Sequence, residues 1–428
     1  MVKKKQKRRW KIGISFLICG ILFYLAYSWE EKIPDSIYLS AGKQNEINLR
    51  LPFHASIETE CKEVMVSDDS HIPSKEVNMA VNRPFLIYTP QIGNYELSLK
   101  LFGIWNIKEI KVNAVEPEYL LPAGFPVGIY LQSDGLFVIG TSKLNDCQGI
   151  TSEPAKEIVK TGDYIVKING NKILNKESFM RMLNENGMQD VKLTIRRGEE
   201  ELDVKIRPVN TAPGEYKLGL WVRDDTQGIG TLTYIDRNNR FGALGHGISD
   251  SDTGLLMEAE KGNLYETNIY TIIKGTSGNP GSLSGTICYG RDHEYGSIRA
   301  NTVQGIFGVA NEALKEQVQG EWILAGYKQD VHKGEAYIRS NVDGVTKDYK
   351  IEILEVNTSS HNNNKGIVLQ VTDEELLRKT GGIVQGMSGS PIIQDGKLIG
   401  AVTHVFIQDS TKGYGIFLEE MKQMDAGV

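Results

Sequence analysis

The sequence has few cysteines and no metal-binding pattern. Only four cysteines occur among 428 residues, far apart from one another: Cys19, Cys61, Cys147 and Cys288. A structural zinc site needs clustered cysteine and histidine ligands, and a disulfide-stapled domain needs more cysteines than this, so both are excluded. We therefore expect no metal and no cofactor, and we assign structural roles to the cysteines.

Internal repeats and long low-complexity tracts are also lacking, and the charge balance is acidic. The formal net charge is −6, although the first eleven residues alone carry seven positive charges and no acid. Without those seven charges, the rest of the chain has a net charge of −13. Proteins that bind nucleic acid need positive charge to neutralise phosphates, so nucleic acid is excluded as a partner.

An apolar segment at residues 12–29 follows the basic residues 1–11. As a helix it would extend about 27 Å, enough for a thin bilayer, and Trp10 and Trp29 stand at its two ends. The pattern predicts a transmembrane anchor with residues 1–11 in the cytosol and residues 30–428 on the external side. A cleaved signal peptide is the alternative, but the end of the apolar run is a poor cleavage site.

The external part divides into three regions by its sequence patterns. Residues 30–117 contain short runs of alternating apolar and polar residues between turns, as in residues 95–101, which predicts a small β-sandwich. Residues 118–208 mix strand patterns with one helical segment near residues 176–184. Residues 209–428 are rich in glycine and short strands, which is typical of an all-β domain. The fold class that we expect is therefore mainly β.

The central region contains the string GDYIVKING at residues 162–170, with Ala155, Ile158 and Val159 before it. This string resembles the core of PDZ domains, which bind a peptide as an added strand. The resemblance implies that a loop with free backbone N–H groups receives the peptide's carboxylate. We place that loop at five residues: Gly124, Phe125, Val127, Gly128 and Ile129.

The candidate nucleophile is Ser388, in the sequence Gly-Met-Ser-Gly-Ser-Pro at residues 386–391. A serine hydroxyl reacts only when a base takes its proton and fixed donors stabilise the oxyanion. Gly386 and Gly389 permit unusual backbone angles, so the N–H groups of Gly386 and Ser388 can converge as an oxyanion hole. Asp395-Gly396 predicts a tight hairpin behind this loop.

The candidate base is His246, in the small-residue turn Gly-Ala-Leu-Gly-His-Gly at residues 242–247. It precedes the serine, as in trypsin-like enzymes, and a pair of small barrels would fit in the roughly 220 residues after residue 208. His404 is the competing histidine. It alternates with Val402 and Phe406 in a strand pattern, so we interpret it as a packed or substrate-lining residue rather than the base.

Four strings resemble one family, the SpoIVB peptidases, which are sporulation signalling serine peptidases with a PDZ domain. The strings are GALGHGISD, KGTSGNPGSLSG, QGIFG and TGGIVQGMSGSPIIQDGKLIGAVTHV. The resemblance implies a trypsin-like double barrel with Ser388 as nucleophile, His246 as base and Asp373 as the acid. Thr372 and Glu375 have capping-box spacing, so Asp373 can instead begin a helix. Asp250 and Asp252 are further candidates for the acid.

The resemblance also implies a biological role. Such a peptidase would be anchored in the forespore membrane, with its bulk in the space facing the mother cell. It would cleave its own N-terminal region and a regulatory subunit of a membrane-embedded protease complex, which leads to activation of a late sigma factor. Two other functions stay open from the sequence: a tethered peptide-binding scaffold with an inactive peptidase fold, and a quality-control peptidase of the heat-shock type.

Overall fold

The computed structural model describes residues 33–47, 54–58, 65–67, 76–80, 84–101, 105–358 and 364–425. The basic segment 1–11 and the predicted anchor 12–29 lie outside the described residues. Within them, none of the helices has the length and apolar character that a membrane crossing requires. The described chain is mainly β, as predicted.

The N-terminal unit consists of two sheets on one core. One sheet has the strand order β1-β8-β7-β3-β5 and the other has the order β2-β6-β4. Alternate residues of β1, β6, β7 and β8 point into a shared hydrophobic cluster, which gives the arrangement of a small β-sandwich. The strands are β1 (Ser36–Ser40), β2 (Gln44–Ile47), β3 (His54–Glu58), β4 (Met65–Ser67), β5 (Glu76–Ala80), β6 (Phe85–Tyr88), β7 (Gly93–Leu101) and β8 (Trp105–Val115).

The next unit is a closed barrel of six strands. Its order around the ring is β10-β21-β24-β25-β20-β19, and β19 pairs with β10 to close it. A hairpin of β22 and β23 and the helix α3 are attached to it. The elements are β9 (Tyr119–Pro122), β10 (Pro126–Thr141), β19 (Leu220–Ile235), β20 (Arg240–Ala243), β21 (Lys261–Tyr265), β22 (Thr267–Ile273), β23 (Ser282–Ile287), the 3-10 turn η1 (Arg291–His293), β24 (Glu294–Thr302), β25 (Gly305–Ala310) and α3 (Glu312–Gln317).

A second six-stranded barrel follows. Its ring has the order β27-β28-β29-β32-β31-β30, and β30 pairs with β27 to close it. Closure leaves no exposed sheet edge around either ring. The elements are β26 (Ile323–Ala325), the 3-10 turn η2 (Lys328–Asp330), β27 (Gly334–Ser340), β28 (Lys347–Val356), β29 (Ile367–Val371), α4 (Glu374–Thr380), β30 (Pro391–Gln394), β31 (Lys397–Phe406), β32 (Asp409–Phe417) and α5 (Leu418–Asp425).

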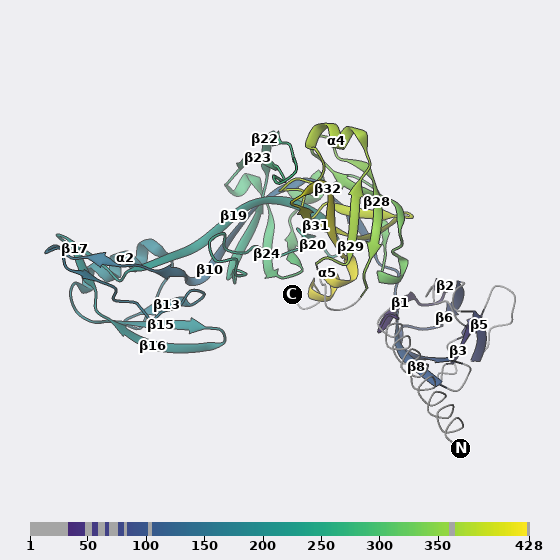
Figure 1. Ribbon diagram of the computed structural model, residues 1–428, viewed down its shortest axis with the longest axis horizontal. Helices are drawn as coiled ribbons and strands as arrows, with labels where there is room; N and C mark the ends of the chain where they lie inside the picture. The colour runs from purple at the N-terminus through teal and green to yellow at the C-terminus, as the bar shows by residue number, and fades with distance from the viewer. Residues whose placement is uncertain are drawn as a thin grey trace, which may run out of the picture.

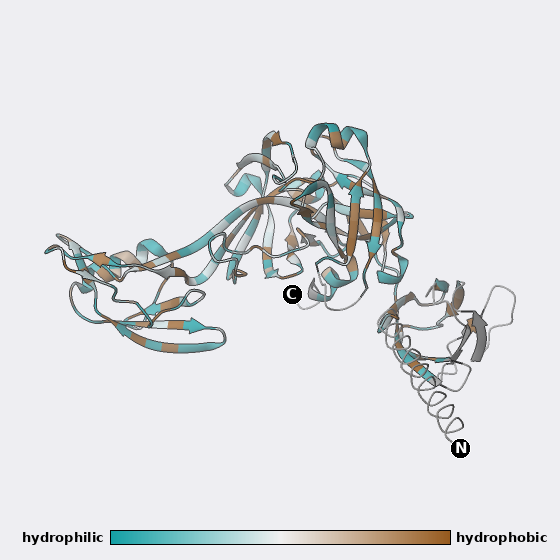
Figure 2. Ribbon diagram, viewed as in Figure 1, coloured by the Kyte–Doolittle hydropathy of each residue, from teal (hydrophilic) through white to brown (hydrophobic). Residues whose placement is uncertain are grey.

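The two barrels are joined by a shared apolar layer. Tyr234 and Phe307 of the first barrel are fully buried against Leu398 and Ile416 of the second. The short strand β9 pairs with both β19 and β26, which links the two rings by backbone hydrogen bonds. Figure 2 shows apolar residues along the barrel strands, and many of them are buried in the barrel cores. The layer fixes the position of one barrel relative to the other.

An α+β insert extends from the first barrel on two long strands. Residues 126–132 of β10 pair within the barrel, whereas residues 137–141 of the same strand pair with residues 220–223 of β19 in the insert. Figure 1 shows β10 and β19 leading from the barrels to the insert at one end of the molecule. Its elements are β11 (Leu144–Asn145), β12 (Thr151–Ser152), β13 (Tyr164–Ile168), β14 (Asn171–Lys172), α2 (Lys176–Asn186), β15 (Val191–Arg197), β16 (Glu200–Ile206), β17 (Val209–Ala212) and β18 (Glu215–Lys217).

This topology corrects two sequence-based predictions. The predicted boundary at residue 118 assigns β9 and the first half of β10 to the central region, but both belong to the barrels. The predicted peptide-binding loop also lies there. Val127 and Ile129 are buried in the barrel core, and Gly128 pairs with strands on both sides. Gly124 and Phe125 precede this strand. Backbone N–H groups within a barrel sheet are already paired, so this segment is not a carboxylate-binding loop.

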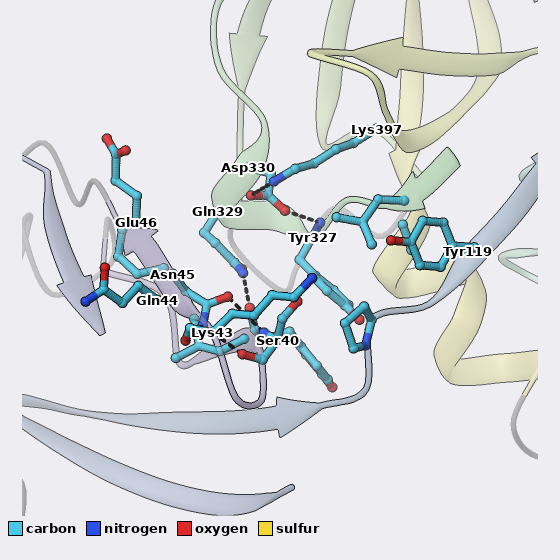
Figure 3. Close-up of a pocket in the computed structure, with 16 residues that line it drawn as sticks. Ser40, Lys43, Gln44, Asn45, Glu46, Tyr119, Tyr327, Gln329, Asp330 and Lys397 are labelled. Carbon is cyan, nitrogen blue, oxygen red and sulfur yellow. Dashed lines mark hydrogen bonds and ion pairs between the residues drawn. The ribbon is translucent and has the colours of Figure 1, made fainter. Parts of the chain in front are cut away.

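The N-terminal unit contacts the second barrel. The ring of Tyr38 stacks on that of Tyr327 with centroids 4.9 Å apart, and the side-chain amide of Gln329 donates to the backbone carbonyl of Tyr38. Figure 3 shows the cavity at this junction, with the ion pair of Lys397 and Asp330 at its edge. The residues that line the cavity include none of the predicted catalytic residues.

The insert is expected to be removable, because Gln132 and Asp225 are paired neighbours at the point where the barrel ends. Replacing residues 133–224 by Asn-Gly would close β10 and β19 as a two-residue hairpin. We expect the shortened protein to keep a cooperative thermal unfolding transition, measured by circular dichroism.

A register control accompanies this variant. Replacing residues 133–225 by the same two residues shifts β19 by one position, which turns its apolar side chains away from the barrel core. This control should lose the cooperative transition. The same thermal transition in both deletion variants would show that packing in the barrel does not fix the register of β10 and β19.

Candidate active site

The loop of the candidate nucleophile lies between α4 and β30, and its backbone requires glycine. Gly386 and Gly389 have φ angles of 101° and 98°, in the region that favours glycine. A Cβ atom at Gly389 would stand 2.0 Å from the carbonyl oxygen of Thr231. Met387 is fully buried in the core of the second barrel, while Ser388 is half-buried. The buried Met387 thus anchors the loop, while the neighbouring serine is partly open to solvent.

Strand β19 of the first barrel holds this loop. The hydroxyl of Thr231 donates to the carbonyl of Gly386 at 2.7 Å, and the N–H of Thr231 donates to the carbonyl of Ser388 at 2.9 Å. The hydroxyl of Thr233 donates to the carbonyl of Gly389 at 2.8 Å. These bonds connect residues more than 150 positions apart in the chain. They place the serine at the junction of the two barrels.

Two backbone N–H groups of this loop, those of Gly386 and Ser388, differ from their neighbours in their hydrogen bonding. Gln385, Met387 and Gly389 donate their N–H groups to backbone carbonyls at 3.1, 3.0 and 2.7 Å. In the described part of the chain, the N–H groups of Gly386 and Ser388 make no hydrogen bond. These are the two donors that the sequence predicts for an oxyanion hole. A site that stabilises an oxyanion needs such donors unoccupied before the substrate arrives.

His246 follows β20 in a turn with strained backbone. Leu244 and Gly245 both have φ angles of 69°, and this is unusual for leucine. The Nδ1 atom of His246 lies 2.9 Å from the carbonyl oxygen of Gly247. A carbonyl only accepts hydrogen bonds, so Nδ1 carries the proton in the neutral ring and Nε2 is left with a lone pair. This is the tautomer that a general base for serine requires.

Ser388 and His246 meet around Thr403. The Ser388 hydroxyl donates to the carbonyl of Thr403 at 2.7 Å, so His246 does not accept its proton in this resting geometry. The ring of His404, the next residue, lies 5.1 Å from the ring of His246 between centroids. Catalytic contacts are often unformed until substrate binds. His404 is solvent-exposed, so it lies beside the base and not in a packed core.

Both histidines are held in the neutral form. Burial of the imidazole lowers the pKa of His246 below its ordinary value, and the hydrogen bond to Gly247 only partly opposes this. Although part of the His404 side chain is open to solvent, partial burial of its ring, followed by the nearby His246 and Lys365, lowers the pKa of His404 to about 4. A neutral imidazole is the form that accepts a proton. The surroundings therefore keep His246 competent as a base near neutral pH.

The predicted acid, Asp373, is not part of this arrangement. Its Oδ1 atom accepts the N–H of Leu376 at 2.9 Å and caps α4, and its Oδ2 atom lies 3.4 Å from the N–H of Lys350. Asp373 lies beyond the end of β29. In that strand Val368, five residues earlier, is the one that pairs with Tyr414 of β32, and Tyr414 in turn pairs with His404. Asp373 therefore begins a helix, which is the alternative that the sequence left open. Its assignment as the acid of the triad is corrected.

The two other candidate acids also have structural partners. Asp250 is buried and accepts from Arg223 at 2.5 Å and from the N–H groups of Asp252 and Thr253. Asp252 pairs with the same arginine at 2.8 Å. In the described part of the chain, the ring of His246 contacts the carbonyl of Gly247 and the ring of His404, and neither carboxylate.

Sequence reasoning missed the residues that assemble the site. Thr231 and Thr403 are small polar residues in strand patterns, and nothing local in the sequence marks their hydrogen bonds to the serine loop. Asn364, which accepts from the Thr403 hydroxyl at 2.7 Å, lies in a segment that the sequence indicates only as an exposed asparagine-rich loop. Only the hydrogen bonds between strands distant in sequence identify these residues.

Comparison with known proteins gives one family match. Residues 214–422 match the family model described as SpoIVB peptidase S55. No curated protein matches the chain.

Several solved structures show partial similarity. The PDZ domain of an SdrC-like protein from Listeria monocytogenes is 19% identical, covers 22% of this chain and 90% of its own, and has a TM-score of 0.17. The inactive form of the Rv3671c protease is 11% identical over 47% of this chain and 84% of its own, with a TM-score of 0.26. The HtrA-type protease AlgW with a decapeptide is 11% identical over 72% and 64% of the two chains, with a TM-score of 0.28.

The lowered pKa values predict how stability depends on pH. Below pH 6.5 the unfolded chain binds protons on these histidines that the folded chain does not bind, so the free energy of unfolding falls as the pH falls. We expect urea unfolding midpoints to decrease from pH 7 towards pH 4. The double variant His246→Gln, His404→Gln should show a shallower decrease, and an unchanged slope would contradict the assignment.

Proposed function

Because residues 214–422 match the family model of the SpoIVB peptidase S55 family, we propose that this serine endopeptidase uses Ser388 as its nucleophile and His246 as its general base. The observation that carries the assignment is their convergence on Thr403. Ser388 contacts its carbonyl, and Gly245, the neighbour of His246, packs on its side chain. The two residues come from different barrels, and the ring of His404 lies beside that of His246 at the same place.

The edge of β31 is the proposed binding site of the substrate backbone. Strand β30 pairs with β31 only as far as Ala401, and the carbonyl of Thr403 lies just beyond that point. An extended substrate would add to this edge as a strand. Its N–H group would take the Thr403 carbonyl as acceptor and release the Ser388 hydroxyl to the Nε2 atom of His246.

The chemical steps then follow. Ser388 Oγ attacks the scissile carbonyl while its proton passes to Nε2 of His246. The N–H groups of Gly386 and Ser388 donate to the oxyanion that forms. The imidazolium returns its proton to the leaving amine, the carbon–nitrogen bond breaks, and an acyl-enzyme remains on Ser388. Water, activated by the same imidazole, hydrolyses this ester and restores the enzyme.

The proposed biological substrates come from the family resemblance. They are the chain's own N-terminal region and a regulatory subunit of a membrane-embedded protease complex, whose cleavage leads to activation of a late sigma factor. The protein would be held in the forespore membrane through residues 12–29 and act in the space facing the mother cell.

Replacing the nucleophile gives the first functional test. Ser388→Ala should reduce cleavage of the chain's own N-terminal region and of fluorescent casein by about 1,000-fold or more, because no hydroxyl remains to attack. Fragments are mapped by mass spectrometry. Ser390→Ala, the same change two residues away at a buried position, is the matched control and should keep cleavage. Identical fragments from wild type and Ser388→Ala would rule out this nucleophile.

The oxyanion hole has its own test. Gly386→Ala forces a side chain into a φ angle of 101° and places a Cβ atom 3.0 Å from Leu283, which turns the peptide N–H away. We expect kcat to fall by about 100-fold or more while KM changes little. Gly396→Ala, with φ of 74° and open space around it, also places alanine at a positive φ angle, in the distant hairpin, and should leave kcat intact. Equal losses in both variants would indicate general destabilisation.

A further inference from the structure

Asn364 connects the two barrels beside the catalytic residues. Its backbone carbonyl accepts the hydroxyl of Thr403 at 2.7 Å, and its side-chain Nδ2 donates to the carbonyl of Val303 at 2.6 Å. Thr403 belongs to β31 of the second barrel, whereas Val303 lies at the tip of the β24–β25 hairpin of the first. One residue therefore spans the junction where Ser388 and His246 meet.

The contacts of the neighbouring glycines place His246 against this span. A Cβ atom at Gly245 would lie 3.0 Å from the side chain of Thr403. A Cβ atom at Gly247 would lie 2.3 Å from the carbonyl oxygen of Thr302, the residue before Val303. His246 stands between these two glycines. The backbone carbonyl of Asn364 bonds to Thr403 and its side-chain amide bonds to Val303. Because these contacts lie on the two sides of His246, we infer that Asn364 lies next to His246.

The side-chain oxygen of Asn364 is buried and has no hydrogen-bond partner in the described structure. The bond from Nδ2 to Val303 fixes the orientation of the amide, so the remaining atom is the oxygen. A buried acceptor without a donor costs about 1–3 kcal/mol, so such a group in a native protein calls for an explanation, of which a catalytic role is one. Here it is an unused acceptor next to a histidine that must gain a proton during catalysis.

Other acceptors near His246 are already engaged. Asn301 accepts the N–H of Ile248 at 2.8 Å through its side-chain oxygen, and its side-chain nitrogen donates to the carbonyls of Ile248 and Met257. Asp250 is paired with Arg223, and Asp373 caps α4. Among the described residues that bracket His246, Asn364 alone offers a free side-chain acceptor.

We propose that Asn364 is the positioning residue of the catalytic centre, and that its side-chain oxygen accepts the Nδ1–H of His246 in the reacting state, in place of the Gly247 carbonyl. This inference rests on the proposed roles of Ser388 and His246. The proton from Ser388 passes to Nε2, and the imidazolium then shares its Nδ1–H with the amide oxygen until Nε2 gives up the proton to the leaving amine. Asn364 itself gains and loses no proton.

Two substitutions at Asn364 test the proposal through different readouts. Asn364→Ala removes the acceptor, so kcat for self-cleavage and casein cleavage should fall by about 100-fold with little change in KM. Asn364→Asp keeps an acceptor and adds a negative charge, which favours the imidazolium. It should retain cleavage and move the acid limb of the kcat profile up by about one to three pH units. Asp373→Asn is the matched control and should leave both kcat and the profile unchanged.

A measurement without turnover separates this inference from the proposed function. In Ser388→Ala protein with ¹⁵N-labelled histidine, NMR titration reports the pKa of His246 directly, and His246→Gln assigns its resonances. We expect Asn364→Asp to raise the pKa of His246, an effect that a purely structural role of Asn364 would not produce. An unchanged pKa of His246 would overturn the proposal, even if Ser388→Ala confirms the nucleophile. Full activity of Ser388→Ala would instead refute the proposed function and leave the NMR result to decide the placement of Asn364.

Discussion

The hydrogen bonds from β19 to the serine loop are the interaction on which the site depends. Thr231 and Thr233 belong to the first barrel and bind the carbonyls of Gly386, Ser388 and Gly389 from the second. The close approach is possible because position 389 lacks a side chain. The candidate residues Ser388 and His246 come from different barrels, so the candidate site forms only where the two barrels meet. The apolar layer between the barrels brings the strands together, and these polar contacts then set the loop's position to within a hydrogen-bond length.

The same strand connects the site to the insert. β19 runs from the insert into the barrel, and the loop after His246 is attached to the insert by several contacts. The N–H of Glu258 donates to the hydroxyl of Tyr164 at 2.9 Å, Arg223 pairs with Asp250 at 2.5 Å, and Met257 is buried among insert residues. The insert and the loop after His246 are therefore in direct contact. The structure provides a direct physical connection between the two parts.

The sequence predicts the parts of the site that have local signals. Ser388 and His246 each lie in a short glycine-rich turn, and such turns can be recognised in a single segment. The serine peptidase class and the mainly β fold follow from them. The peptide-binding loop was misplaced because residues 124–129 have the pattern of a glycine-containing loop, while strands β19 and β21, distant in sequence, recruit them into a barrel. Asp373 was misassigned because a helix cap and a catalytic acid use the same residue type, and only the register of β29 separates them. Asn364 has no local signal at all.

The nature of the group beside His246 bears on how fast the enzyme can work. Burial lowers the pKa of His246, and no carboxylate among the described residues contacts its ring. A neutral amide or carbonyl acceptor fixes the tautomer of the imidazole, but it stabilises the imidazolium less than a negative charge does. The proton transfer from Ser388 is then less favourable, and the chemical step is slower. The resting bond of Ser388 to Thr403 adds a second barrier, because the substrate backbone must displace it. Under the proposed roles of Ser388 and His246, both features favour cleavage of a chain that is presented as a matching strand over cleavage of any exposed chain.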